Sequence, residues 1–421
     1  MHEHRRGDRH TFVAPQIGGE ALKEFGAPEK LPSLNAIAIA SSVFRAEQAI
    51  RRGHVRRVIL PIYRAAGLRY DLRPLQELIR QLLIFTLVED IEVEFDEELA
   101  PTRSTREPPA RRRAASVCLF SGGVDSYAGL LLTREAFDSV EAVFCAHADQ
   151  PRIIHVANSL ARRKFDRIHV RVNKVPVPSI GAHGYAQLRG FLYLLCGAAW
   201  VHELRASRLV VTECGPTMYQ PRFSPVDSIT MTTHPFVVRT ASQIMDLLLQ
   251  RRVRISVPFA NLTKAEVVAI CPDKDGLKMT HSCVSSRFGT HDGTCYGCVI
   301  RRLATTASGV DDVRYNKNPM ADTLASSGNL LSLLAFCSDF LLRRNQMEEF
   351  EVGTIDSFGR RELFKRFSLD NFGAIYRLIA ENRRVQRPVR QFYENLVGRI
   401  GVRPLRDRLS ELRSPTAVPR F

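Results

Sequence analysis

The chain has 421 residues, of which 45% are apolar and 25% charged, and its formal net charge is +16. This composition indicates a folded soluble protein of two or three domains. Nine cysteines in a chain of this kind argue against a disulfide scaffold. The longest apolar stretch, from Phe191 to Val201, is shorter than the roughly 20 residues of a membrane span. Without a signal-peptide pattern near Met1, we expect a cytoplasmic protein with no membrane partner.

Residues 1–103 predict a small α/β unit, an N-terminal extension without recognisable chemistry. The apolar patterns predict strands at 34–44, 58–63 and 91–95 and helices at 46–52 and 75–87. Residues 104–115, rich in Pro, Arg, Ser and Thr, predict a linker.

Residues 116–312 predict an α/β domain in which strands and helices alternate. The expected strands are 116–120, 140–147, 167–172, 208–214 and 253–257. A helix starting near 127 and helices at 153–164, 188–204 and 264–270 are expected between and after them. This alternation implies a parallel sheet with helices on both faces, and ligands then bind at the carboxyl ends of the strands.

Residues 313–421 predict a C-terminal helical extension, with helical spacing at 324–344, 372–383 and 389–400. This extension contains neither a glycine loop nor metal-ligand spacing. We expect it to pack on the rest of the chain or to dock a partner.

The residues directly after the strand at 116–120 carry the strongest chemical signal. They are Ser121, Gly122, Gly123, Val124, Asp125 and Ser126. A glycine turn between a strand and a helix directs several backbone N–H groups at one point, which suits a phosphate. Asp125 repels a phosphate, so it fits here as a Mg²⁺ ligand or as a helix cap. The spacing is that of neither a Walker loop nor a Gly-x-Gly-x-x-Gly turn.

A second pattern, in residues 280–302, indicates a structural zinc site. Cys295 and Cys298 form a Cys-x-x-Cys knuckle, and Cys283 is a third candidate ligand. Candidates for the fourth ligand are His291, Asp292 and His281, and we take His291 as the first choice. The alternative is a redox pair, but the strand that precedes such a pair in thioredoxin-type folds is missing.

The glycine turn resembles the PP-loop, Ser-Gly-Gly-x-Asp-Ser, of the N-type ATP pyrophosphatases. Together with the cysteines, it resembles the 7-cyano-7-deazaguanine synthase (QueC-like) family. The matching positions are Cys283, Gly293, Cys295, Cys298, Arg301 and the run Gly309-Val310-Asp311, with Asp292 where the family has its second cysteine. The segment 258–266 resembles the family's Pro-x-x-x-x-Thr-Lys-x-Glu, and Tyr219 to Arg222 resembles its Tyr-Pro-x-x-Arg loop with altered spacing. Arg189 is a weaker match.

The resemblance implies an adenine nucleotide alpha hydrolase-like fold and a C–N ligase that forms AMP and pyrophosphate, with ATP, Mg²⁺ and Zn²⁺ as cofactors. It implies that Ser121, Gly122, Gly123 and Ser126 hold the β- and γ-phosphates and that Asp125 serves Mg²⁺. It also implies that Lys264 contacts phosphate and that Arg222 pairs with the substrate carboxylate or the α-phosphate. The substrate would be a carboxylated deazaguanine that becomes an amide or a nitrile, as in queuosine-type biosynthesis.

A core flanked by extensions on both sides resembles the QatC-type branch of antiphage-defence operons. The amine acceptor would then be ammonia or an amine of a partner protein from the same operon. The alternatives are a PP-loop enzyme that modifies tRNA and a non-catalytic component that binds a nucleotide or a nucleic acid. The net positive charge favours nucleic acid, but the arginine clusters lack interleaved aromatic residues.

Overall fold

The central sheet has five strands in the order β6-β5-β4-β7-β8, and every neighbouring pair is parallel. In this computed structural model the described residues are 11–14, 30–53, 55–64, 71–87, 90–99, 113–146, 170–174, 187–219, 233–283, 290–321, 328–342, 357–415, 419 and 421. The strands are β4 (Ser116–Leu119), β5 (Val140–Ala146), β6 (Val170–Lys174), β7 (Arg208–Val210) and β8 (Arg254–Ser256).

The chain leaves the central strand β4 toward β5 and β6, then returns to form β7 and β8 on the other side. Cys118 of β4 is opposite Ala142 of β5 and Val210 of β7. The strand order therefore reverses between β4 and β7. Such a switch point opens a crevice at the carboxyl ends of the two strands, where ligands bind in open α/β sheets.

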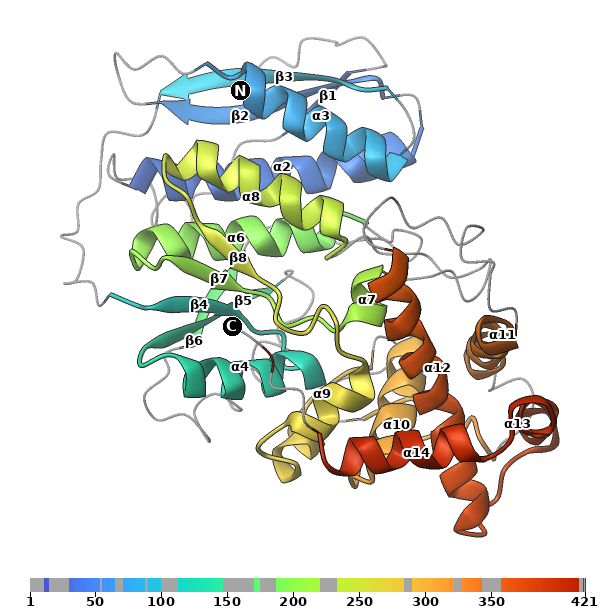
Figure 1. Cartoon of the computed structure of the whole chain (residues 1–421). Coiled ribbons are helices and arrows are strands. Elements are labelled where there is room, and N and C mark those ends of the chain that lie inside the picture. Colours follow the sequence, from blue (N-terminus) through green and yellow to red (C-terminus); the bar gives the residue numbers. More distant parts are fainter. Residues whose placement is uncertain are drawn as a thin grey trace.

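Helices cover both faces of this sheet (Figure 1). The helices α6 (Arg189–Glu203) and α8 (Pro235–Leu249) lie on one face, and α4 (Val124–Ala136) lies on the other with α9 (Lys264–Ile270) beside it. The prediction of an α/β fold with a parallel sheet and helices on both faces is confirmed.

A second, smaller parallel sheet forms from residues near the N-terminus, with the order β1-β2-β3. It comprises β1 (Thr11–Val13), β2 (Arg57–Arg64) and β3 (Glu92–Leu99), accompanied by the helices α2 (Leu31–Arg51) and α3 (Arg73–Leu87). The prediction of a strand at 34–44 is wrong, because α2 covers these residues, and the helix predicted at 46–52 corresponds to the end of α2. This helix packs against β2 and against α6, so nearly all of its residues are buried and its sequence lacks an amphipathic period.

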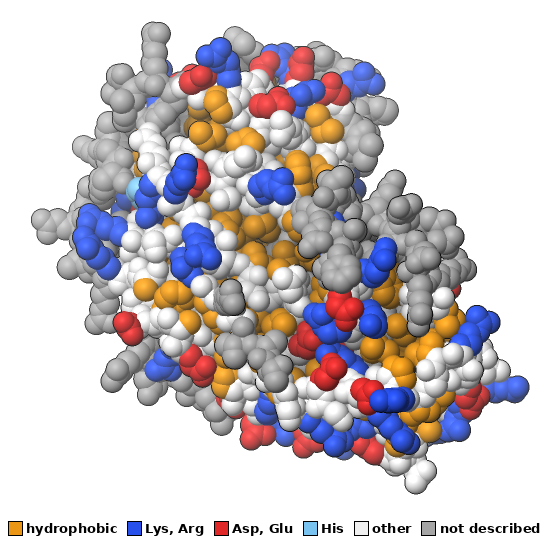
Figure 2. All heavy atoms as spheres, in the orientation of Figure 1, with side chains coloured by type: hydrophobic (Ala, Val, Ile, Leu, Met, Phe, Trp, Pro, Cys, Tyr) orange, Lys and Arg blue, Asp and Glu red, His pale blue; other side chains and the backbone are white. Residues whose placement is uncertain are grey.

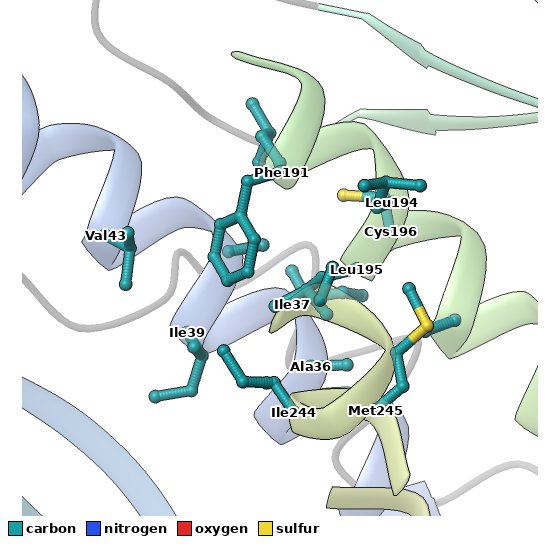
Figure 3. Close-up of a cluster of buried hydrophobic side chains, with 14 of the residues drawn as sticks. Ala36, Ile37, Ile39, Val43, Phe191, Leu194, Leu195, Cys196, Ile244 and Met245 are labelled. Carbon is teal, nitrogen blue, oxygen red and sulfur yellow. The ribbon is translucent and has the colours of Figure 1, made fainter. Parts of the chain in front are cut away.

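Helix α2 joins the small sheet to the central one. Apolar side chains of α2, α6 and α8 meet in one core, shown in Figure 3. Glu47 of α2 accepts hydrogen bonds from the backbone of Gln187 (2.7 Å) and Leu188 (2.8 Å), at the start of α6. Ser33 donates to Glu203 at the other end of α6 (2.8 Å). Although burial raises the pKa of Glu47, these amides favour its ionised form. The α2–α6 contact is thus fixed at both ends.

Further helices follow β8 in the sequence. They are η2 (Asp275–Met279), α10 (Tyr296–Ser308), α11 (Gly328–Leu342), α12 (Ser357–Ala380), α13 (Arg387–Ile400) and α14 (Arg403–Arg413), and a short helix, α7 (Gly215–Tyr219), follows β7. The helices predicted at 324–344, 372–383 and 389–400 correspond to α11, the end of α12 and α13. The predicted helix at 153–164 lies outside the described residues. One apolar core contains residues of β4, α4, α9 and α10–α14. The C-terminal helices therefore pack directly on the central domain.

Gly129 permits the close approach of α4 to the segment after β7. A Cβ at this position would clash with the side chain of Thr212. We expect Gly129→Ala to lower the free energy of unfolding by about 1–3 kcal/mol. Gly398→Ala in α13, where a Cβ meets nothing within 4 Å, is the matched control and should raise it by about 0.5–1 kcal/mol. Urea denaturation checks both, and equal effects would contradict the packing described.

Candidate functional site

The loop of residues 121–126, here called the glycine loop, leaves the end of β4 and enters α4 at the switch point. Gly122 has a φ of +77°, and Gly123 is the N-cap residue of α4. Ser126 Oγ donates to the Gly123 carbonyl (3.1 Å) and lies 3.1 Å from Ser121 Oγ. Gly123 has no side chain to cap the first N–H groups of α4, so these donors suit an anion.

Asp125 and Lys264, 139 positions apart, form a partly buried ion pair beside this loop. The Asp125 Oδ2 atom accepts from Lys264 Nζ (2.6 Å) and lies 3.4 Å from the backbone N of Cys214, which donates to it. Burial lowers the pKa of Lys264, but Asp125, Cys214 and Glu213 together outweigh this effect and raise the pKa above its ordinary value. A cation in the first turn of a helix is disfavoured by the helix dipole, and here the Asp125 carboxylate compensates for it. The sequence predicted both residues as part of one site, and the structure brings them together.

Glu213, which the sequence reasoning missed, belongs to the same group of charges. It follows β7, the strand next to β4. Burial, and after it the Asp125 carboxylate, raise the pKa of Glu213 to about 7, although the charges of Lys264 and Arg189 oppose the shift. A lone acidic residue after the apolar run 209–211 is the signal that could have identified it. The signal becomes decisive only once β7 is known to be the neighbour of β4.

Of the buried polar atoms that have no hydrogen-bond partner within the described residues, three lie near this group of charges. They are Asp125 Oδ1, Thr212 Oγ1 and Arg189 Nε. Asp125 and Thr212 are 6% and 5% exposed, which leaves little access for bulk water. Because buried polar atoms are nearly always hydrogen-bonded, atoms of this kind fit a site that receives a polar or ionic ligand.

The raised pKa of Glu213 predicts how stability depends on pH. The folded protein binds this proton more tightly than the unfolded chain, so the contribution of Glu213 is fully present below about pH 4.5 and is lost as pH rises through about 7. Glu213→Gln removes the titrating carboxyl group, so the variant does not lose this stability as pH rises. We expect the variant to gain on the order of 2 kcal/mol relative to wild type between pH 4.5 and 8, a figure discounted for partial solvent exposure. Urea unfolding across this range checks it. The exposed Glu394→Gln is the control, and parallel curves for Glu213→Gln and wild type would contradict the assignment.

The second group of functional side chains is the cysteine cluster, Cys283, Cys295 and Cys298. All three are buried, and their sulfur atoms lie within 4.8 Å of one another. The sulfurs of Cys283 and Cys295 are 3.7 Å apart. Ligands about 2.3 Å from a tetrahedral zinc lie about 3.8 Å from each other. The cluster therefore has the spacing of a metal site and can hold an ion such as zinc.

Local backbone features form this cluster. Cys295 is the N-cap residue of α10 and Cys298 lies in its first turn. Gly293 has a φ of +96°, and a Cβ there would clash with the carbonyl of Lys317. Asp292 donates its backbone N–H to Cys283 Sγ (3.4 Å), while its carboxylate accepts from the backbone of Cys295 (3.1 Å). Asp292 thus supports the turn that presents the sulfurs.

The fourth ligand stays a prediction. Within the described residues the group of converging ligand atoms contains the three cysteines and does not include His291. The Nε2 atom of His291 lies 3.4 Å from the backbone N of Ser282 and 3.5 Å from Arg301 Nη1. The rings of His281 and His291 are 4.8 Å apart. His291 therefore lies beside the cluster, with this nitrogen occupied elsewhere.

Arg301 links the cysteine cluster to the glycine loop. This fully buried side chain donates to the carbonyls of Leu277 (2.8 Å) and Thr280 (2.7 Å) and to Asp312 (2.9 Å). His281, which follows Thr280 in the sequence, donates its backbone N–H to the Gly122 carbonyl (2.9 Å). The aspartate that pairs with Arg301 is thus Asp312. Asp311, in the Gly-Val-Asp run that the sequence analysis compared with the family pattern, is exposed and lies 3.7 Å from Lys278.

The predicted site residue Arg222 lies outside the described residues. In comparisons with known proteins, no family model matches the chain and no curated protein sequence matches it. Among the helices of the described residues, none combines the length and apolarity that crossing a membrane requires. The residues of the site are therefore what indicates its chemistry.

Proposed function

We propose that the chain is a PP-loop ATP pyrophosphatase of the 7-cyano-7-deazaguanine synthase type, which adenylates a carboxylated deazaguanine. The observation that carries the proposal is the convergence, at the switch point of the sheet, of an uncapped helix N-terminus with the partly buried Asp125–Lys264 pair. A nucleotide bound there would meet backbone donors, a fixed cation and carboxylates at one end of the sheet. This combination suits a triphosphate with its divalent cation.

The glycine loop is assigned to the β- and γ-phosphates. Ser121 and Ser126 supply hydroxyls, while Gly122 and Gly123 let the chain approach closely. The backbone N–H groups of Val124 and its neighbours at the start of α4 supply the remaining donors. Lys264 lies beside this loop as a protonated cation and reduces the charge repulsion between ATP and the substrate carboxylate.

Asp125 and Glu213 are assigned to Mg²⁺. Within the described residues, Asp125 has one carboxylate oxygen without a hydrogen-bond partner, and it lies near enough to Glu213 to raise the pKa of that residue. Two such carboxylates, one in the first turn of α4 and one after β7, have the oxygen donors that Mg²⁺ takes. Bound there, Mg²⁺ would neutralise phosphate oxygens. The cysteine cluster is assigned to a structural Zn²⁺, because its segment holds Gly122 in place through His281.

These positions suggest a reaction in balanced steps. A carboxylate oxygen attacks the α-phosphorus of ATP, and pyrophosphate leaves. An amine then attacks the acyl carbon of the adenylate, AMP leaves, and an amide forms with release of a proton. Attack of the amide oxygen on a second ATP would release pyrophosphate, and loss of this oxygen as part of AMP, with the two protons of the amide nitrogen, would give the nitrile. The chain contributes alignment and charge stabilisation rather than a covalent intermediate.

The acceptor amine and the biological setting remain part of the proposal. Ammonia gives a small-molecule product, whereas an amine of a partner protein gives a modified protein, as suits a QatC-type antiphage-defence component acting in the cytoplasm. The flanking extensions motivate the second option. On the face shown in Figure 2, Lys and Arg side chains are interspersed with Asp and Glu, so that face offers little support for a continuous nucleic-acid surface. The alternatives are a tRNA-modifying PP-loop enzyme and a non-catalytic nucleotide-binding or nucleic-acid-binding component.

Product analysis tests the proposal. The protein is incubated with ATP, Mg²⁺, a carboxylated deazaguanine and ammonia, with and without proteins encoded beside it. We expect AMP and pyrophosphate in equal amounts, dependent on the deazaguanine, with an amide or nitrile product or a mass increase on a partner protein. ADP and phosphate, or no nucleotide cleavage, would overturn the proposal, and AMP formation that instead requires tRNA would favour the tRNA-modifying alternative.

A further inference from the structure

The first turn of α9 carries Lys264 between two residues that cap the helix. The Thr263 Oγ1 atom accepts from the Glu266 N–H (3.2 Å), and the Glu266 Oε2 atom accepts from the Thr263 N–H (2.8 Å). This reciprocal arrangement is a capping box, which fixes how the chain enters a helix. Since α9 spans only Lys264–Ile270, its first turn is half of the helix. The capping residues therefore fix the backbone position from which the Lys264 side chain extends.

Residues from the C-terminal helices bind both capping residues. Thr263 Oγ1 donates to Asp370 of α12 (2.5 Å). Glu266 Oε1 accepts from Arg366 of α12 (2.8 Å) and from Arg408 of α14 (2.6 Å). Arg408 also donates to Asp370 (2.7 Å), which closes a ring of contacts. We call Thr263, Glu266, Arg366, Asp370 and Arg408 the capping network.

The centre of the capping network is buried. The side chains of Arg408, Asp370 and Glu266 are 5%, 4% and 14% exposed. Burial raises the pKa of Asp370 to about 6 although Arg408 opposes the shift, so its carboxylate is largely ionised at neutral pH. Removing one partner from a buried, hydrogen-bonded ion network leaves an uncompensated charge and is costly. These contacts therefore restrain the start of α9 more firmly than exposed ion pairs would.

Figure 1 shows α12 and α14 lying next to α9 and α10, close to the carboxyl end of the central sheet. In the capping network these two helices reach the residues on either side of Lys264, whose Nζ atom lies 2.6 Å from Asp125. We propose that α12 and α14 position Lys264 at the glycine loop through the capping network, with Arg408 as the principal positioning residue. The effect of this positioning on catalysis rests on the proposed function. The C-terminal helices are then a structural part of the ATP site and not only a surface for partners.

The test measures the environment of Lys264 directly, without relying on turnover. Full-length wild type, Arg408→Met, Arg408→Lys and Glu266→Gln are acylated briefly with acetic anhydride, and labelling of Lys264 is quantified by mass spectrometry against the exposed Lys365. Gln retains the capping box because it can still accept from the Thr263 N–H, but it lacks the charge that pairs with Arg366 and Arg408. Arg403→Gln on the exposed side of α14 is the matched control.

We expect Arg408→Met and Glu266→Gln to increase Lys264 labelling by about tenfold, the factor corresponding to 1.36 kcal/mol of lost restraint. Arg408→Lys should restore part of the protection, and Arg403→Gln should match wild type. In AMP formation, the first two variants should lose kcat. Arg408→Met leaves Asp370 and Glu266 without their shared cation, so it should also lower the global unfolding midpoint. Unchanged Lys264 labelling in folded Glu266→Gln would overturn the positioning role. If wild type forms no AMP, the proposed function fails while the labelling result still decides the positioning.

Discussion

Replacing Asp125 with alanine should abolish AMP formation, with a loss of turnover of at least about a thousandfold. The substitution removes the carboxylate that pairs with Lys264 at 2.6 Å and the oxygen assigned to Mg²⁺. It also leaves the cation of Lys264 partly buried without its partner. A single change thus disturbs both the charge balance and the geometry of the glycine loop. Quantitative separation of AMP, ADP and ATP after a fixed incubation measures the effect.

Two further variants separate this effect from misfolding. Asp125→Asn retains the shape of the side chain, so it should fold like wild type and remain inactive. Asp275→Ala, at an exposed aspartate of η2, should keep full activity. AMP formation by Asp125→Asn at the wild-type rate would show that the glycine loop is wrongly assigned.

Loss of the metal site should have the second large effect. Wild type is expected to contain one zinc per chain, whereas Cys295→Ser and Cys298→Ser should contain much less. Structural zinc sites contribute strongly to folding, so we expect the unfolding midpoint to fall by on the order of 10 °C. Because the cluster segment bonds to Gly122 through His281, ATP affinity should fall as well. Elemental analysis and calorimetry measure the two changes.

Cys337→Ala is the control for this experiment. Cys337 is buried in the core of the C-terminal helices, away from the cluster, and burial raises the pKa of its thiol to about 12. Its replacement should leave the zinc content unchanged even if it costs some stability. Equal zinc in Cys298→Ser and wild type, or zinc loss in Cys337→Ala, would contradict the assignment.

The sequence was sufficient to predict the features that depend on local pattern. The glycine loop after a buried strand, the helix at Lys264 and the Cys-x-x-Cys turn each occupy a short stretch with a strong backbone or ligand preference. The run at 34–44 was misread because α2 is buried against β2 and α6 on opposite sides. Apolar residues on all faces remove the period that distinguishes a helix from a strand.

Features that depend on long-range contacts could not be predicted. Glu213 becomes relevant only because β7 pairs with β4, and strand order is not encoded in a local pattern. Arg366 and Arg408 lie 100 and 142 positions from Glu266, which they contact, and in a chain with 60 Lys and Arg residues neither is distinctive. Asp312 rather than Asp311 pairs with Arg301 because the geometry after α10 turns Asp311 toward solvent.

The central claim, that the chain activates a carboxylate as its adenylate, can be tested by isotope transfer. A carboxylated deazaguanine labelled with ¹⁸O in both carboxylate oxygens is incubated with ATP, Mg²⁺ and ammonia, and the AMP is analysed by mass spectrometry. If a carboxylate oxygen attacks the α-phosphorus, each AMP released from the labelled substrate carries one ¹⁸O. Unlabelled AMP, or label found in inorganic phosphate, would contradict the account.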